Sequence, residues 1–239
     1  MSSNNTKFKI ATTLAHAKTI IDTSVTDKTT TLLLFDIDMT LTFPDNQAVR
    51  YPAIARNLLT YYNVMVNNGY LTRTLATVLD PALLIEKDAL EILNSFDMKT
   101  ILFTACVSGK VGPVESVKQV KYEGLKRLGI DFDHTFKQDL ENPVFYKGIL
   151  FSQNDDRKGA VLVDFLKKMK FTAFKTIVLV DDQQNNLKDV RNALHEHFSE
   201  IKFVGVHYQG AFMKGGDISA EEFKAFWVRT SSLANEESS

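Results

Sequence analysis

Two short apolar runs of this chain end abruptly in pairs of acidic residues. The first, Leu32–Phe35, is followed by Asp36, Ile37 and Asp38, with Thr40 two positions later. Residues i and i+2 of a strand point to the same side, so the carboxylates of Asp36 and Asp38 should project together. They would lie at the carboxyl end of the strand, where open α/β sheets place their sites. Adjacent carboxylates repel each other, and a divalent cation or a shared proton relieves that repulsion.

The same pattern recurs later in the chain, where the apolar run Ile177–Val180 ends in Asp181 and Asp182. Between the two acidic pairs, a run that ends at Phe103 is followed by the hydroxyl of Thr104, and Lys158 stands at the threshold of a predicted helix. Two acidic strand ends, one hydroxyl and one lysine are the groups that phosphoryl transfer requires, because they hold and neutralise a phosphate.

The hydrophobic pattern predicts strands that alternate with helices. Strands are predicted at 32–37, 99–104, 130–136, 176–180 and 202–208, a hairpin at 143–152, and helices at 8–22, 51–69, 80–94, 114–128, 159–169, 187–198 and 219–228. This alternation predicts an α/β fold with a doubly wound parallel sheet. We expect 7–43 and 98–230 to form the core, 44–97 to form a small helical cap over the strand ends, and 231–239 to be a flexible acidic tail.

Composition excludes several classes of protein. The chain has 239 residues, a formal net charge of −1 and one cysteine, Cys106. The charge gives no basic field for nucleic acid, and one cysteine forms neither an internal disulfide nor a structural zinc site. No apolar run reaches the ~18 residues of a membrane span, and the N-terminus lacks an export signal. We therefore expect a soluble, cytosolic protein without an integral membrane segment, or one delivered into a host cell.

The ordered set of motifs resembles the haloacid dehalogenase (HAD) superfamily, whose members are mainly phosphatases. Its four motifs match Asp36–Thr40, Thr104, Lys158 and Asp181-Asp182, and the resemblance extends from the first strand to about Tyr208. It implies a Rossmann-like core with a C1-type cap. The segment 148–159 (GILFSQNDDRKG) is similar to a bacterial effector-type branch that includes a protein-tyrosine phosphatase.

The resemblance also implies a role for each motif residue. Asp36 would be the nucleophile and a Mg²⁺ ligand, and Asp38 the general acid and base, with its backbone carbonyl facing the metal. Thr104 and Lys158 would bind the phosphate. Asp182 would be the direct metal ligand on the later strand, and Asp181 either a supporting or an alternate ligand. Lys158 is the favoured phosphate-binding cation, and its neighbour Arg157 is the alternative, because either could occupy the start of the helix.

These roles predict a Mg²⁺-dependent phosphomonoester hydrolase that works through an aspartyl-phosphate. The favoured substrate is a phosphotyrosine protein, such as a host phosphoprotein, or another aryl phosphate. The alternatives are a small-metabolite phosphatase and a binding or scaffold protein that keeps the fold with a vestigial site. A phospho-accepting signalling receiver does not fit, because its acidic pair and its phospho-acceptor lie on different strands and its length is about half that of this chain.

Overall fold

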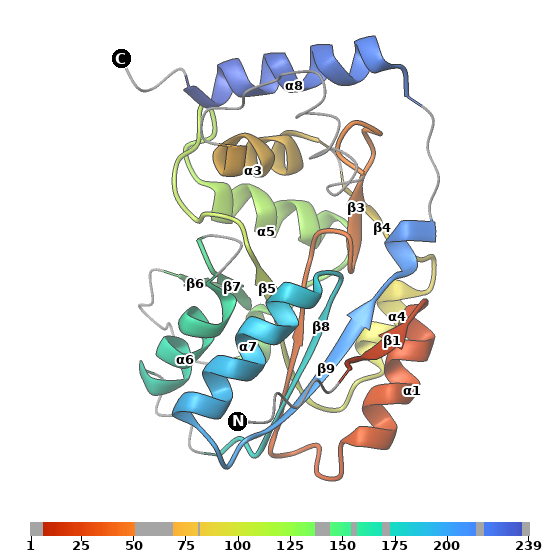
Figure 1. Ribbon diagram of the computed structural model, residues 1–239, viewed down its shortest axis with the longest axis vertical. Coiled ribbons are helices and arrows are strands. Elements are labelled where there is room, and N and C mark those ends of the chain that lie inside the picture. The colour runs from red at the N-terminus through yellow and green to blue at the C-terminus, as the bar shows by residue number, and fades with distance from the viewer. Residues whose placement is uncertain are drawn as a thin grey trace.

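A central parallel sheet organises the molecule (Figure 1). The computed structural model describes residues 7–50, 69–80, 82–136, 144–153, 157–168, 173–213 and 218–235. The sheet has seven strands in the order β1-β9-β8-β2-β5-β7-β6. In chain order these are β1 (Lys9–Ala11), β2 (Thr31–Phe35), β5 (Lys99–Thr104), β6 (Phe145–Tyr146), β7 (Ile149–Phe151), β8 (Thr176–Asp181) and β9 (Lys202–Tyr208). Only β6 runs antiparallel to its neighbour in this sheet.

Helices cover both faces of the sheet, because its strands are apolar on both sides. On one face lie α1 (Leu14–Ser24), α4 (Ala89–Asn94) and α5 (Val117–Arg127), which pack with Leu33 and Phe35 of β2. On the other lie α6 (Lys158–Lys168) and α7 (Gln184–His197), which pack with the alternate residues Leu32 and Leu34. The predicted α/β fold with a doubly wound parallel sheet is confirmed, with the short strand β6 as its antiparallel member.

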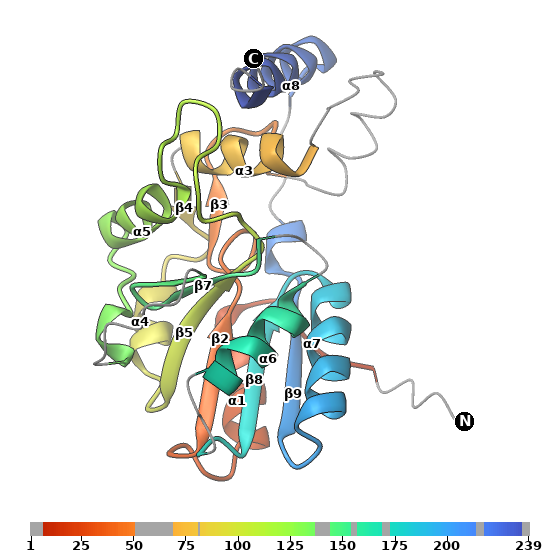
Figure 2. The ribbon, with the colours of Figure 1, turned by 90° about the vertical axis from the view of Figure 1, so that its left-hand side faces the viewer.

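A second layer lies beyond the carboxyl ends of the central strands (Figures 1 and 2). It contains the antiparallel pair β3 (Thr42–Pro44) and β4 (Ala82–Leu84), with the helices α3 (Gly69–Leu79) and α8 (Ala220–Asn235). We call these four elements the cap layer. Its own apolar cluster joins Ala48, Val49 and Ala76 to Phe223 and Trp227 of α8.

The cap layer differs in extent from the segment 44–97 that the sequence indicated. The C-terminal helix α8 packs mainly on α3, while Leu233 and Ala234 in its last turn join the main apolar cluster of the core. The helix continues to Asn235, into the predicted tail. Conversely, α4 packs against α1 on the sheet. The predicted helix at 51–69 falls almost wholly outside the described residues.

Two predicted elements near the core take another form. The beginning of the predicted helix 8–22 is wrong, because Lys9–Ala11 form β1. The helix α1 begins only after Thr13, whose hydroxyl accepts a hydrogen bond from the backbone N–H of His16 at 3.1 Å. The predicted strand 130–136 is wrong. It contains a 3₁₀ turn at 133–135, because Asp131 Oδ1 accepts from the backbone N–H of Asp133 and closes a local turn.

The predicted hairpin at 143–152 is present as β6 and β7, joined by Lys147 and Gly148 with positive φ angles of 47° and 79°. Within the part of the chain that is described, no helix combines the length and apolar character needed to cross a membrane.

Candidate active site

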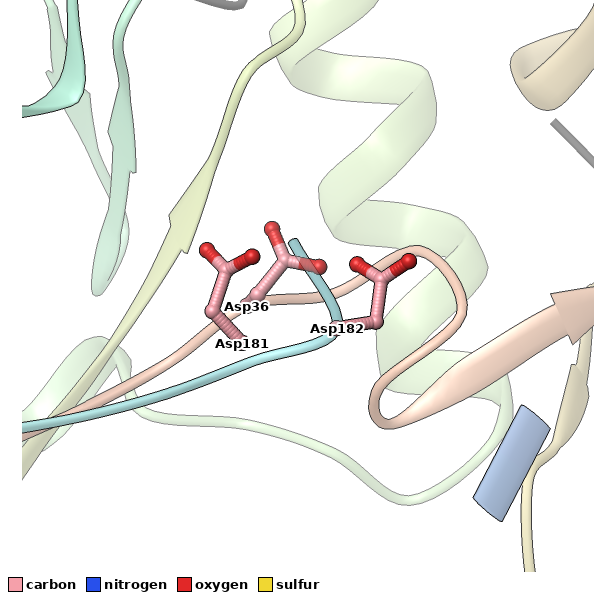
Figure 3. Close-up of side chains that lie close together, drawn as sticks. All are labelled: Asp36, Asp181 and Asp182. Carbon is pink, nitrogen blue, oxygen red and sulfur yellow. The ribbon is translucent and has the colours of Figure 1, made fainter. Parts of the chain in front are cut away.

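The carboxyl ends of β2 and β8 bring three buried acids together. The strands are parallel neighbours in which Phe35 lies opposite Val180, so Asp36 follows directly beside Asp181 and Asp182. One carboxylate oxygen from each acid lies within 4.8 Å of the others. The three carboxylates point the same way from the strand ends (Figure 3). Asp36 is 5% exposed, Asp181 0% and Asp182 5%, so burial makes their charges costly.

Lys158, the first residue of α6, supplies a cation to this cluster. Its Nζ lies 2.6 Å from Asp36 Oδ1 and 2.7 Å from Asp181 Oδ2, and it also donates to the carbonyl oxygen of Phe103 at 2.7 Å. Its side chain is fully buried, whereas Arg157 is exposed. The structure therefore places Lys158, and not Arg157, at the acids.

The hydroxyl of Thr40 links the two strand ends. It donates to Asp36 Oδ2 at 3.2 Å and accepts from the backbone N–H of Asp182 at 3.2 Å. The loop between Asp36 and Thr40 turns sharply at Met39, which has a φ of 67°, and this turn brings the hydroxyl back over the carboxylate.

Charge in the cluster is unbalanced, because Lys158 is the only cation in ion-pair contact with the three acids among the described residues. Burial, opposed by Lys158 and reinforced by Asp181 and Asp38, raises the pKa of Asp36 from 3.8 to about 7. Burial and the charges of Asp36 and Asp181 raise the pKa of Asp182 well above its usual value. Burial alone would lower the pKa of Lys158, but Asp181 and Asp36 outweigh it and raise that pKa. The three acids could therefore hold a metal ion, which would supply the missing positive charge.

The two neighbouring acids at the end of β8, Asp181 and Asp182, differ in how many hydrogen bonds they accept from the protein. Asp181 Oδ2 contacts Lys158, both of its oxygens accept from Asn186 Nδ2 at 3.0 and 3.1 Å, and Oδ1 accepts from the backbone N–H of Gln183 at 2.8 Å. Among the described residues, the carboxylate of Asp182 accepts one hydrogen bond, from Gln183 Nε2 to Oδ2 at 2.6 Å. Asp182 thus keeps more ligand capacity, and Asp181 mainly orients Lys158.

His207, at the end of β9, fixes the backbone of Asp182. Its Nδ1 lies 3.2 Å from the amide nitrogens of both Gln184 and Gln209, which can only donate. The ring proton therefore sits on Nε2, which donates to the carbonyl oxygen of Asp182 at 3.0 Å.

The side chain of Asp38 lies apart from the three-acid cluster. Its Oδ1 is 2.5 Å from Nζ of Lys121 on α5, and its Oδ2 is 3.5 Å from the hydroxyl of Thr104. Thr104 also accepts from the backbone N–H of Cys106 at 3.3 Å. The structure thus joins Asp38 and Thr104 to each other, and Asp36 to Asp181, Asp182 and Lys158. Burial raises the pKa of the Cys106 thiol, which disfavours the reactive thiolate.

Sequence reasoning missed the contacts of Lys121, Asn186 and His207. Lys121 had a usable signal, because it occupies an apolar register of its helix between Val117 and Leu125, where an unpaired lysine would be costly. His207 also had one, because it stands near the carboxyl end of a parallel strand. For Asn186 no such signal exists in the sequence.

Comparisons with other proteins place the chain in a family. The family model described as "Protein of unknown function (DUF2608)" matches residues 13–238. An uncharacterized protein of Rickettsia prowazekii is similar to this chain, with 27% identity over 203 residues that cover 78% of the chain and 72% of that relative. An uncharacterized protein of Rickettsia felis is 32% identical over 95 residues, 35% of the chain and 32% of the relative. No solved structure matches the chain significantly. Since the family model spans nearly the whole chain, the protein belongs to the DUF2608 family.

Proposed function

We propose that the protein is a divalent-cation-dependent phosphomonoester hydrolase in which Asp36 is the nucleophile. The observation that carries this proposal is the convergence of three buried carboxylates with one buried lysine at the carboxyl edge of the sheet. Such a site can hold a cation beside a carboxylate that attacks an anionic ester. The resemblance of the motifs to the HAD superfamily supports the same chemistry.

Mg²⁺ fits the donor set, because the site offers only hard oxygen ligands and carries two more negative than positive charges. Asp36 and Asp182 would hold the ion, since protein donors already engage both oxygens of Asp181. When bound, Mg²⁺ would offset the repulsion between the Asp36 carboxylate and the phosphate dianion.

The reaction assigned to the chain has two steps. In the first, a carboxylate oxygen of Asp36 attacks phosphorus, the bond to the leaving oxygen breaks, and Asp38 gives that oxygen a proton. In the second, water attacks phosphorus and passes a proton to Asp38. Inorganic phosphate leaves and Asp36 regains its carboxylate. Asp36 thus acts as the nucleophile, and Asp38, which follows the same strand, exchanges a proton in both steps.

Two further residues would stabilise the transferred phosphate. Lys158 already contacts Asp36 and would offset the charge that develops on the phosphoryl oxygens. Thr104 would donate its hydroxyl to one of these oxygens in place of its long, 3.5 Å contact with Asp38. Thr104 is the last residue of β5 and Lys158 the first of α6, so regular elements hold the backbone of both.

The first experiment compares wild type with Asp36→Asn in the hydrolysis of 4-nitrophenyl phosphate, with and without Mg²⁺. Wild type is expected to need Mg²⁺, and Asp36→Asn to lose at least about a thousandfold in kcat, because an amide is not a nucleophile. Asp164→Asn, which changes an exposed acid on α6, is the matched control and should keep full activity. Wild-type turnover by Asp36→Asn would remove this residue as the nucleophile.

For the substrate we propose an aryl phosphate, in particular phosphotyrosine in a protein, on the strength of the similarity to the effector-type branch. A panel of phosphotyrosine peptides, sugar phosphates and nucleotides, ranked by kcat/KM, tests this. Higher kcat/KM for the metabolites than for every peptide would assign the protein to small-metabolite hydrolysis. Binding of Mg²⁺ without turnover of any ester would favour a binding protein instead.

A further inference from the structure

A buried lysine outside the three-acid cluster contacts Asp38, the general acid of the proposed reaction. Lys121 projects from α5 with its side chain only 6% exposed, and its Nζ lies 2.5 Å from Asp38 Oδ1. The two residues are 83 positions apart in the chain. A buried ammonium is costly unless it is paired, so the position of this lysine depends on the carboxylate.

The two strand-end carboxylates, Asp36 and Asp38, are held by different lysines. Asp36 contacts Lys158 from α6, on one face of the sheet, while Asp38 contacts Lys121 from α5, on the other face. Both carboxylates follow the end of β2 and are only two residues apart, so their like charges would otherwise repel. The two lysines therefore give the neighbouring carboxylates separate, fixed positions.

The side chain of Asp38 is more exposed than that of Lys121, as suits a group that exchanges a proton with a substrate. The side chain of Asp38 is 29% exposed, five times as much as that of Lys121. Lys121 also lines a cavity of about 300 Å³ between α5 and the end of α3, together with Thr77 and Val78. The lysine is thus buried, whereas part of the carboxylate that it holds is open to solvent.

We propose that Lys121 is the positioning residue of Asp38: it holds the carboxylate at the place where it exchanges a proton with the leaving oxygen. This inference rests on the proposed function, because it takes Asp38 as the general acid. It gives a residue of α5, the helix that follows β5 in the chain, a part in the reaction. None of the four motifs contains this residue.

The test uses two substrates that differ in how much they need a general acid. The leaving oxygen of 4-nitrophenyl phosphate departs without a proton, whereas that of 4-nitrobenzyl phosphate requires one. Asp38→Asn should therefore lose about 10²–10⁴-fold in kcat on the benzyl ester and much less on the phenyl ester. Lys121→Met, which keeps the stem and removes the charge, should show the same bias, at least about tenfold, and Asp38→Asn/Lys121→Met should be barely slower than Asp38→Asn alone.

Two other variants complete the design. Lys126→Met changes an exposed lysine on the same helix and should leave both rates unchanged. Lys121→Gln keeps a hydrogen-bond donor at similar reach and should recover part of the benzyl-ester rate. If Lys121→Met does not fold, Lys121→Gln alone decides, because it should still show a larger loss on the benzyl ester than on the phenyl ester.

The outcomes separate this inference from the function on which it rests. A wild-type protein inactive on both esters would overturn the proposed function. An active wild type, with equal losses on the two esters in the Lys121 variants or with fully additive losses in the double variant, would overturn only the role of Lys121.

Discussion

Gly159 determines how closely Lys158 can approach the acids. A Cβ at this position would lie 2.6 Å from the backbone oxygen of Asp189 and 2.8 Å from Cβ of Ala193, both on α7. The backbone N–H of Gly159 also donates to Asp189 Oδ2 at 2.6 Å. The close packing of α6 on α7 therefore requires glycine here, and this packing sets the first residue of α6 beneath the strand ends.

Two glycines in helices give opposite predictions for the same substitution. Gly159→Ala should destabilise the protein by about 1–3 kcal/mol, because α6 must move away from α7. Gly124→Ala on α5 should stabilise it by about 0.5–1 kcal/mol, because the new methyl group meets only the end of Arg127, at 3.8 Å. Urea unfolding monitored by circular dichroism measures both. Equal changes in the free energy of unfolding for the two variants would contradict the close packing of α6 on α7 at Gly159.

The positions of single residues of the candidate site could be predicted where a simple rule links the type of residue to its place in the fold. Asp36, Asp181 and Asp182 follow apolar strands, and the parallel sheet then brings them together. Asp38 was expected beside Asp36, yet it pairs with Lys121, because that lysine comes from a helix whose position over the sheet no local pattern reveals.

At the level of elements, the segment 80–94 shows why local signals failed. Asp80 was expected to cap a helix, but its Oδ2 accepts from the backbone N–H of Asn46 at 2.8 Å. Residues Ala82–Leu84 then pair with β3, and the helix starts only at Ala89. The competing partners lie about 40 residues earlier in the chain, so propensity alone could not identify them.

Glu86, in the same segment, ties the cap layer to the core. Its carboxylate accepts from the backbone N–H of Leu14, at the start of α1, at 2.9 and 3.1 Å, and from the hydroxyl of Tyr208 at 2.6 Å. Burial and the bond to Glu86 raise the pKa of Tyr208, so the phenol stays a donor. One side chain thus joins the exit of β4 to the beginning of α1 and the end of β9.

Glu86→Ala should therefore lower the free energy of unfolding by about 2–4 kcal/mol, because it removes the charged partner of two donors. Tyr208→Phe should cost about 1 kcal/mol and should cost almost nothing further once Glu86 is alanine. Lys87→Ala, at the exposed neighbouring position, is the control. Additive losses in the urea midpoints would show that the phenol and the carboxylate act independently.

For the whole molecule, the alternation of strands and helices predicted the doubly wound sheet and the edge at which the three acids meet, although it missed β1 and placed a wrong strand at 130–136. The packing of α8 on α3 could not be predicted from the sequence, because its partners are set by long-range contacts. The indole N–H of Trp227 donates to the carbonyl oxygen of Ala48 at 3.0 Å, 179 positions earlier in the chain. The helix completes the cap layer through this contact and through its packing on α3.

The excess negative charge at the site makes stability depend on pH and on cation together. The pKa of Asp36 is raised from 3.8 to about 7, so between these values the folded chain keeps a proton that the unfolded chain loses. The contribution of Asp36 to stability in the absence of metal is therefore full below about pH 4 and falls as the pH rises towards 7. The raised pKa of Asp182 acts in the same direction.

A bound cation should reverse this loss, since it binds the ionised carboxylates and competes with their protons. We expect the gain in the free energy of unfolding on addition of excess Mg²⁺, followed as a rise in Tm, to be small at about pH 5 and large at about pH 8. It should approach about 2.7 kcal/mol when Mg²⁺ is at about 100 times its Kd. Asp182→Asn should abolish most of the gain, whereas Asp181→Asn should weaken it less, because Asp181 is already occupied by Lys158 and Asn186. The opposite order would make Asp181 the direct ligand. A gain independent of pH, or one that survives in the Asp36→Asn/Asp182→Asn variant, would place the cation away from these carboxylates.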